Sequence, residues 1–261
     1  MVRARDDMAA ALAAFFVARR GEIVAPLLRA YGGKGAKALG STPDLATLTP
    51  EELAAEVQRL LDLMDMTPWE GLPADIQPLL EGIAKDGGLA GLAQVNAGDV
   101  ADALHAMDAR AVAWAQERAA EMVGMKWVDG SLVPNPDAAW SISDATRELV
   151  RADVTQALQE GWSNQTLMHA LEESDAFTRE RAEMIARTET AYADAAANQA
   201  AWRESGMATG KEWLLAEAPC DICQGNADAG VIGLDEAFPS GDTEEPAHPR
   251  CECVTVPVLK E

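Results

Sequence analysis

Two short clusters near the end of the chain hold its four cysteines and one of its three histidines. Cys220 and Cys223 form a Cys-x-x-Cys turn, and after 24 further residues come His248, Cys251 and Cys253. A Cys-x-x-Cys turn brings two thiolates within reach of one ion, and sets of four Cys and His residues bind structural zinc. We therefore predict a structural zinc ion bound by four of these five residues. Spacing alone leaves the spare residue open.

The segment around these residues gives a physical reason for a metal. Residues 217–261 include ten acidic and two basic residues and few large apolar side chains. An apolar core alone would order such a segment weakly, whereas a structural zinc ion contributes on the order of 10 kcal/mol to folding. Its charge would also offset part of the acidic repulsion.

Other chemistries of paired cysteines fit this sequence less well. A zinc deaminase needs an upstream His-x-Glu, and the available pair, His169 and Glu172, has a different spacing. A redox Cys-x-x-Cys requires a βαβ setting, and a metalloprotease zinc requires a His or Glu pair at helical spacing. Two disulfides, which suit an exported protein, and metal-free thiols stay open as alternatives.

Composition predicts a mainly helical protein. The 261 residues are 48% hydrophobic but only 5% aromatic, and alanine-rich runs alternate with Glu, Arg, Gln and Leu, which favour helices. The net charge of −22 opposes sequence-independent binding to nucleic acid, and it suits solubility and a basic protein partner equally well. No apolar stretch reaches the 18 residues of a membrane span, so no membrane association is expected.

The first twenty residues imitate a signal peptide, because Arg3 and Arg5 precede an apolar run over residues 8–18. Asp6 and Asp7 interrupt the basic part, so we expect a docked amphipathic helix instead of a cleaved leader. Its apolar face consists of Leu12, Phe15, Phe16 and Val17. Folding in a reducing cytoplasm follows from this interpretation.

Three helices are predicted between residues 48 and 124. Residues 48–66 begin with Thr49 as N-cap and Glu52 completing a capping box. Residues 73–88 form a shorter helix that Gly87 and Gly88 would end, and residues 97–124 form a long one that contains His105, expected to be a packed or surface residue. Predicted core positions are Leu53, Val57, Leu60, Leu61, Met64, Val100, Leu104, Met107, Val112 and Met122.

A hairpin and a linker interrupt this helical pattern. Asp129-Gly130 predicts a tight hairpin turn, and Pro134 and Pro136 indicate an extended linker. We place the main domain boundary near residue 140.

Helices continue beyond this boundary and end in a β-rich cap. Ser141 is a predicted N-cap and Gly161 a C-cap, and a long helix runs from residue 178 to Gly206. Within this helix Glu183 and Arg187 stand at i and i+4. Its packed face consists of Ile185, Glu189, Tyr192, Ala196, Gln199 and Trp202. Strand-like runs at 211–215, 230–234 and 253–258 complete an α+β fold with a zinc-stabilised cap.

The last 120 residues resemble the phage Mu F-like minor head protein family, over about residues 141–258. The resemblance rests on Arg187-Thr188-Glu189 in the long helix, on Trp213 before Cys-x-x-Cys, and on His-Pro-x-Cys-x-Cys at 248–253. Glu252 departs from the pattern, since the family usually has Arg there. The segment 224–230 is also looser than its usual form.

The resemblance implies a structural, non-enzymatic protein of the phage head. It implies association with the portal protein, and contact with the major capsid or scaffolding protein is a further possibility. The expected location is the virion near the portal, and the host cytoplasm during assembly. Residues 1–140 would then be a helical docking region, with the apolar face of residues 8–17 as one contact. Residues 141–261 would be the Mu F-like head morphogenesis domain, with its Cys/His cap at 211–258, and would support procapsid assembly, genome packaging or ejection.

Two other functions remain open at this point. A metal-dependent hydrolase or nuclease acting during packaging would need a general base, for which Asp221 and Glu252 are candidates. A zinc-bearing nucleic-acid module would need a basic face, for example from Arg179, Arg181 and Arg187, in spite of the net charge of −8 over residues 217–261.

Overall fold

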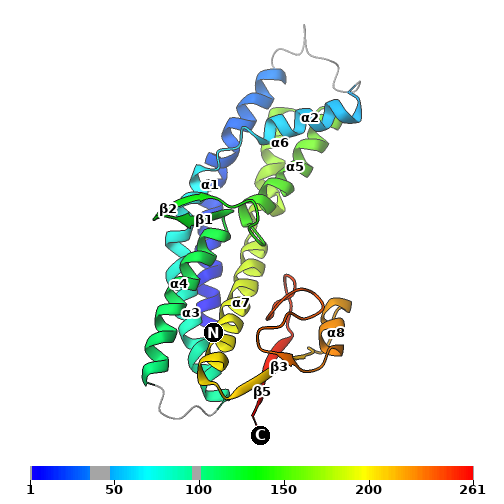
Figure 1. Cartoon of the computed structure of the whole chain (residues 1–261). Helices are drawn as coiled ribbons and strands as arrows, with labels where there is room; N and C mark the ends of the chain where they lie inside the picture. The colour runs from blue at the N-terminus through cyan, green and yellow to red at the C-terminus, as the bar shows by residue number, and fades with distance from the viewer. Residues whose placement is uncertain (1, 36–47, 96–100, 261) are drawn as a thin grey trace. The chain divides into compact units, whose positions relative to one another are not determined.

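The computed structural model describes residues 2–35, 48–95 and 101–260, with side chains for 3–32, 48–95 and 109–260. The described chain is mainly helical and has two small antiparallel sheets, which confirms the predicted α+β class (Figure 1). Three predicted core residues, Val100, Leu104 and Met107, and also His105, lie outside the described side chains. None of the described helices combines the length and the apolarity that a bilayer-spanning helix requires.

Helices make up most of the described chain, a two-stranded hairpin lies between the fourth and fifth α-helices, and the other three strands follow the seventh. In chain order the elements are α1 (Val2–Gly35), α2 (Pro50–Leu61), η2 (Thr67–Gly71), α3 (Leu72–Gln94), α4 (Ala101–Glu121), β1 (Met125–Val128), β2 (Ser131–Pro134), α5 (Ile142–Glu160), α6 (Asn164–Glu173), η3 (Asp175–Phe177), α7 (Arg179–Ser205), β3 (Ala208–Leu214), α8 (Asp221–Asp228), β4 (Ile232–Gly233) and β5 (Val254–Leu259).

The chain forms two compact units, each assembled from separate segments. The cysteine-bearing unit comprises residues 1–9, 76–118 and 183–261, and the hairpin-bearing unit comprises residues 10–75 and 119–182. The predicted main boundary near residue 140, between a helical docking region and a head morphogenesis domain, stays a prediction.

Local capping chemistry places the helix ends where the sequence predicts them. The Thr49 hydroxyl accepts from the backbone N–H of Glu52, whose carboxylate accepts from the backbone N–H of Thr49. The Ser141 hydroxyl caps α5 by accepting from the backbone N–H of Asp144, and Gly161 ends this helix in the left-handed conformation at φ 66°. Because these signals lie within four residues of each helix end, they act independently of the tertiary fold.

An aromatic cluster forms the core of the hairpin-bearing unit. The ring centroids of Phe15 and Phe16 lie 4.9 and 6.2 Å from that of Trp69. Leu12, one helical turn before them in α1, is fully buried. The predicted amphipathic helix is confirmed, although Val17 lies outside the buried face and is 74% exposed. The face of residues 8–17 is buried in the protein itself, so its prediction as a portal contact is wrong.

Arg181 is also buried in the hairpin-bearing unit. Its guanidinium donates to the Thr146 hydroxyl at 2.8 Å and to the carbonyl oxygens of Ile142 and Ala176, and it lies 5.3 Å from the Phe16 ring centroid. Burial lowers the pKa of Arg181 to about 10. Its charge therefore holds the fold together and cannot belong to the predicted basic face for nucleic acid.

The predicted hairpin is confirmed. Strands β1 and β2 pair antiparallel with Val128 opposite Ser131. Asp129 and Gly130 form the two-residue turn at φ 49° and 76°, as the right-handed twist of a tight hairpin requires.

Helix α3 continues beyond the glycines that were predicted to end it. A Cβ atom on Gly87 would lie 2.8 Å from Oδ1 of Asp194 in α7, and one on Gly91 would lie 2.8 Å from the Cα of Asn198. These glycines therefore allow α3 and α7 to approach closely, and α3 ends only at Gln94.

Helix α4 shows a second difference from the predicted core. It buries the small side chains Ala111 and Ala115, whereas Val112, predicted as a core residue, is exposed. Because alanine is only weakly apolar, a row of alanines does not identify the buried face of a helix from sequence.

The sheet of the cysteine-bearing unit has the strand order β4-β3-β5, which confirms the three predicted strand regions. Its edge strand β5 presents few free donors. The carboxylate of Glu245 accepts from the backbone N–H and the hydroxyl of Thr255 at 2.9 and 2.6 Å, and Pro257 has no N–H. Such features limit pairing with a further strand.

Candidate metal centre

Helix α8 and the loop before β5 position the five predicted ligands. Cys220 is the N-cap residue of α8, and Cys223 is buried in its first turn. His248 and Cys251 face each other across a tight turn, in which the Cys251 N–H donates to the His248 carbonyl at 3.1 Å. Arg250 adopts φ 64° to close this turn. Cys253 follows directly and is buried.

The ligand atoms lie at distances that a metal ion could bridge. The Nε2 atom of His248 is 3.2 Å from the Cys220 sulfur and 3.4 Å from the Cys223 sulfur. The sulfurs of Cys223 and Cys251 are 3.6 Å apart. Two thiolates on one tetrahedral zinc with bonds of about 2.3 Å lie about 3.8 Å apart. The residues form two overlapping groups that share Cys223, one with Cys220 and His248 and one with Cys251 and Cys253.

The orientation of His248 also fits a metal. Its Nδ1 atom lies 2.9 Å from the carbonyl oxygen of Pro249. Because a carbonyl can only accept, Nδ1 carries the proton and the lone pair of Nε2 faces the sulfurs. Metal-binding histidines make this outer hydrogen bond almost always. The residues therefore fit a bound zinc ion.

When no cation is bound, burial favours the protonated form of the two inner thiols, Cys223 and Cys251. Desolvation raises the pKa of Cys223 and of Cys251 above the ordinary thiol value. Hydrogen bonds, first of all from the backbone of Cys223, lower the pKa of the exposed Cys220. A divalent cation would displace the inner protons, since thiolates are the metal-binding form. No disulfide links these four cysteines.

The Arg-Thr-Glu motif of α7 contacts the turn that carries His248, Cys251 and Cys253. Arg187 forms an ion pair with Glu252. The Thr188 hydroxyl accepts from the backbone N–H of Arg250 at 3.4 Å. Two of the three motif residues thus contact the segment between His248 and Cys253. The ion pair of Arg187 with Glu252 therefore joins the Arg-Thr-Glu motif of the helix to the Cys/His segment.

Glu189, the third motif residue, points to α4 and forms a buried ion pair with Arg118. The Nε and Nη2 atoms of Arg118 donate to the two carboxylate oxygens at 2.7 and 2.6 Å, and the side chains are 2% and 3% exposed. The guanidinium also lies 5.2 Å from the centroid of the Tyr192 ring. Sequence reasoning missed Arg118, because it is 71 residues away and no local pattern marks it.

Comparison with known proteins supports the predicted resemblance. Residues 148–256 match the family model described as Phage Mu protein F like protein. The chain is also 31% identical over 129 residues to a protein of Bacillus subtilis (strain 168) named "Uncharacterized protein YqbB". That alignment covers 44% of this chain and 42% of the relative, so the chain spans less than half of the relative's length. No solved structure matches the chain.

Proposed function

We propose, from the membership of residues 148–256 in the phage Mu F-like family, that this protein is a minor head protein of a phage and acts as a structural component near the portal. The family match indicates a head morphogenesis protein. The observation that carries the proposal is the physical connection between the Arg187-Thr188-Glu189 helix and the Cys/His cap. A scaffold of this kind supports procapsid assembly, genome packaging or ejection.

Portal contact requires an exposed surface of the docking region, which the face of residues 8–17 does not supply. The hairpin offers one, because Trp127, Val128 and the nearby Trp140 are exposed. A two-stranded hairpin is marginally stable without packing on another surface. We infer that this hairpin contacts the portal protein.

Co-expression with the portal protein of the same phage, followed by size-exclusion chromatography, tests both statements. The intact protein should co-elute with the portal ring, and the double variant Trp127→Ser, Val128→Thr should not. Val17→Thr is the control, since it removes an apolar side chain outside the hairpin that is more exposed than those of Trp127 and Val128. Separation of the intact protein from a folded ring would refute portal association itself.

We further propose that zinc is held by Cys220, Cys223, His248 and Cys251, whose sulfur and nitrogen atoms form one series of close contacts. Cys253 is the spare residue, and its sulfur accepts from the backbone N–H of Ala216 at 3.4 Å. The ion would order the cap. Metal analysis should give one zinc per chain for the intact protein and for Cys253→Ser, but none for Cys251→Ser. The reverse pattern would exchange the two assignments.

A hydrolase or nuclease function receives no support from the surroundings of the centre. Of the two candidate bases, Glu252 is held by Arg187, and Asp221 begins α8. We therefore retain the structural role.

A further inference from the structure

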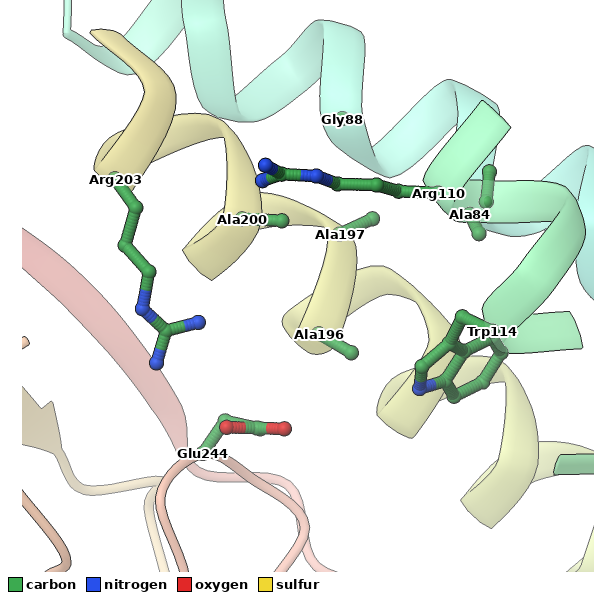
Figure 2. A pocket seen from close by; sticks show the side chains of 10 residues that line it. Ala84, Gly88, Arg110, Trp114, Ala196, Ala197, Ala200, Arg203 and Glu244 are labelled. Carbon is green, nitrogen blue, oxygen red and sulfur yellow. The ribbon is translucent and has the colours of Figure 1, made fainter. Parts of the chain in front are cut away.

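A pocket of about 300 Å³ opens in the cysteine-bearing unit between α3, α4, α7 and the loop that carries Glu244 (Figure 2). Its α7 wall consists of the alanines Ala196, Ala197 and Ala200. This volume lies at the lower end of the range for ligand pockets, about 300 to 1,000 Å³. The pocket therefore suits a single side chain better than a nucleotide or a larger ligand.

An indole forms the aromatic wall of the pocket. Trp114 projects from α4, and its ring packs edge-on against Tyr192 with a centroid distance of 5.6 Å and an interplanar angle of 73°. Tyr192 in turn lies beneath the guanidinium of Arg118. The indole thus packs on Tyr192, which Arg118 of the buried ion pair contacts in turn, and it presents a preformed surface to a ligand.

The two arginines that line the pocket are already neutralised by carboxylates that do not line it. Arg110 binds Glu204 at 2.5 Å. The Nε atom of Arg203 binds Asp235 at 2.7 Å, and its Nη2 atom binds the side-chain oxygen of Gln199 at 2.6 Å. Both guanidinium groups are therefore less available to bind an anionic ligand.

Glu244 is different, because within the described ranges no salt bridge engages its carboxylate. Figure 2 shows this carboxylate pointing into the space between Arg203 and Trp114. The Glu244 carboxylate accepts from the Thr243 hydroxyl, and its charge also acts on the buried Lys211, whose ammonium donates to the carbonyl oxygens of Leu234 and Thr243 at 2.8 and 2.6 Å. The charge that faces the pocket without a salt bridge is therefore negative.

We propose that this pocket binds a basic side chain, Arg or Lys, of a partner protein. The methylene stem would lie on the alanines, as long cationic side chains do on apolar surfaces. The cationic group would then stack on Trp114 and pair with Glu244. The net charge of −22 attracts a basic partner to this surface. This site is independent of the zinc centre and goes beyond the proposed head role.

A short blocked peptide with one arginine tests the proposal on the full chain. Its citrulline analogue has nearly the same shape but no charge, and a glutamate analogue reverses the charge. The probe is the indole N–H resonance of Trp114 in nitrogen-15 spectra, assigned from its loss in Trp114→Phe. The arginine peptide should shift this resonance saturably and bind about five-fold or more tightly than the citrulline peptide.

Two variants separate the pocket from non-specific attraction to an acidic protein. Glu244→Gln should weaken arginine binding by about five-fold, whereas Glu217→Gln, an exposed carboxylate outside the pocket, should leave it unchanged. Ala200→Leu, which narrows the pocket, should abolish binding at an unchanged melting temperature. Equal binding of citrulline, tighter binding of the glutamate peptide, or no saturable shift would each overturn the proposal.

Discussion

The buried pair of Arg118 and Glu189 allows a quantitative test of how the family motif holds the fold. Glu189→Gln would remove the carboxylate that the buried Arg118 binds, and Arg118→Met would remove the guanidinium that the buried Glu189 binds. Removing one partner of a buried ion pair costs about 3–5 kcal/mol. The side chains are 2% and 3% exposed, so solvent cannot compensate, and the upper part of this range applies.

The double variant Arg118→Met, Glu189→Gln should be markedly less destabilised than the sum of the two single variants, because no buried charge remains. Guanidinium unfolding followed by circular dichroism measures these free energies of unfolding. In a chain of this size each kcal/mol also lowers the melting temperature by about 2–4 °C. Each single variant should therefore lose about 8–20 °C.

Arg19 and Glu22 supply the matched control. They also form an Arg–Glu pair, but their side chains are 49% and 53% exposed. The same substitutions there should cost less than about 1 kcal/mol. If Glu189→Gln cost no more than Glu22→Gln, or if the double variant equalled the sum of the singles, the pair would not be the buried unit described here.

Four further outcomes follow from the structure. Gly91→Ala should destabilise the protein by about 1–3 kcal/mol in thermal unfolding, whereas Gly82→Ala in the same helix, with open space around it, should stabilise it by up to about 1 kcal/mol. Chelation of zinc should expose the chain after residue 206 to protease while the N-terminal helices stay resistant, and unchanged cleavage would argue against a structural ion. Burial raises the pKa of Glu245 to about 7, so the folded protein holds a proton that unfolding releases. Stability should therefore fall as pH rises from about 4.5 to 7, and Glu245→Gln should flatten this dependence in denaturant titrations. Glu252→Arg, which restores the residue usual in the family, should change the free energy of unfolding by less than about 1 kcal/mol with full zinc content, since both side chains of its pair are about half exposed.

The sequence predicts best those features whose physical cause is local. Thr49, Ser141 and Gly161 mark helix ends through bonds to neighbouring residues, and all three predictions are confirmed. Cysteine spacing likewise places the candidate ligands of each cluster on a tight turn, and the tertiary structure brings the two clusters together in groups that share Cys223. Contacts between residues that are distant in the chain leave no local pattern in the sequence. Nothing near Arg118 in the chain indicates Glu189, and the alanines that line the pocket look like ordinary helix formers.

Glycine shows why the remainder of the fold could not be predicted. Gly206 ends α7 at φ 61°, as predicted, whereas Gly87 continues α3 and accommodates a neighbouring helix. The two roles require the same residue, and only the tertiary structure distinguishes them. A prediction from sequence therefore assigned the local role to both.

The three residues of the family motif differ in how strongly the structure constrains them. Arg187 and its partner Glu252 are 45% and 58% exposed, so their ion pair contributes less than about 1 kcal/mol. Glu189 is buried against Arg118, where any unpaired charge is costly. A replacement at residue 252 should therefore be tolerated by the fold, whereas one at residue 189 should not. The low cost of a change at residue 252 is consistent with the acid that this chain carries between its last two cysteines.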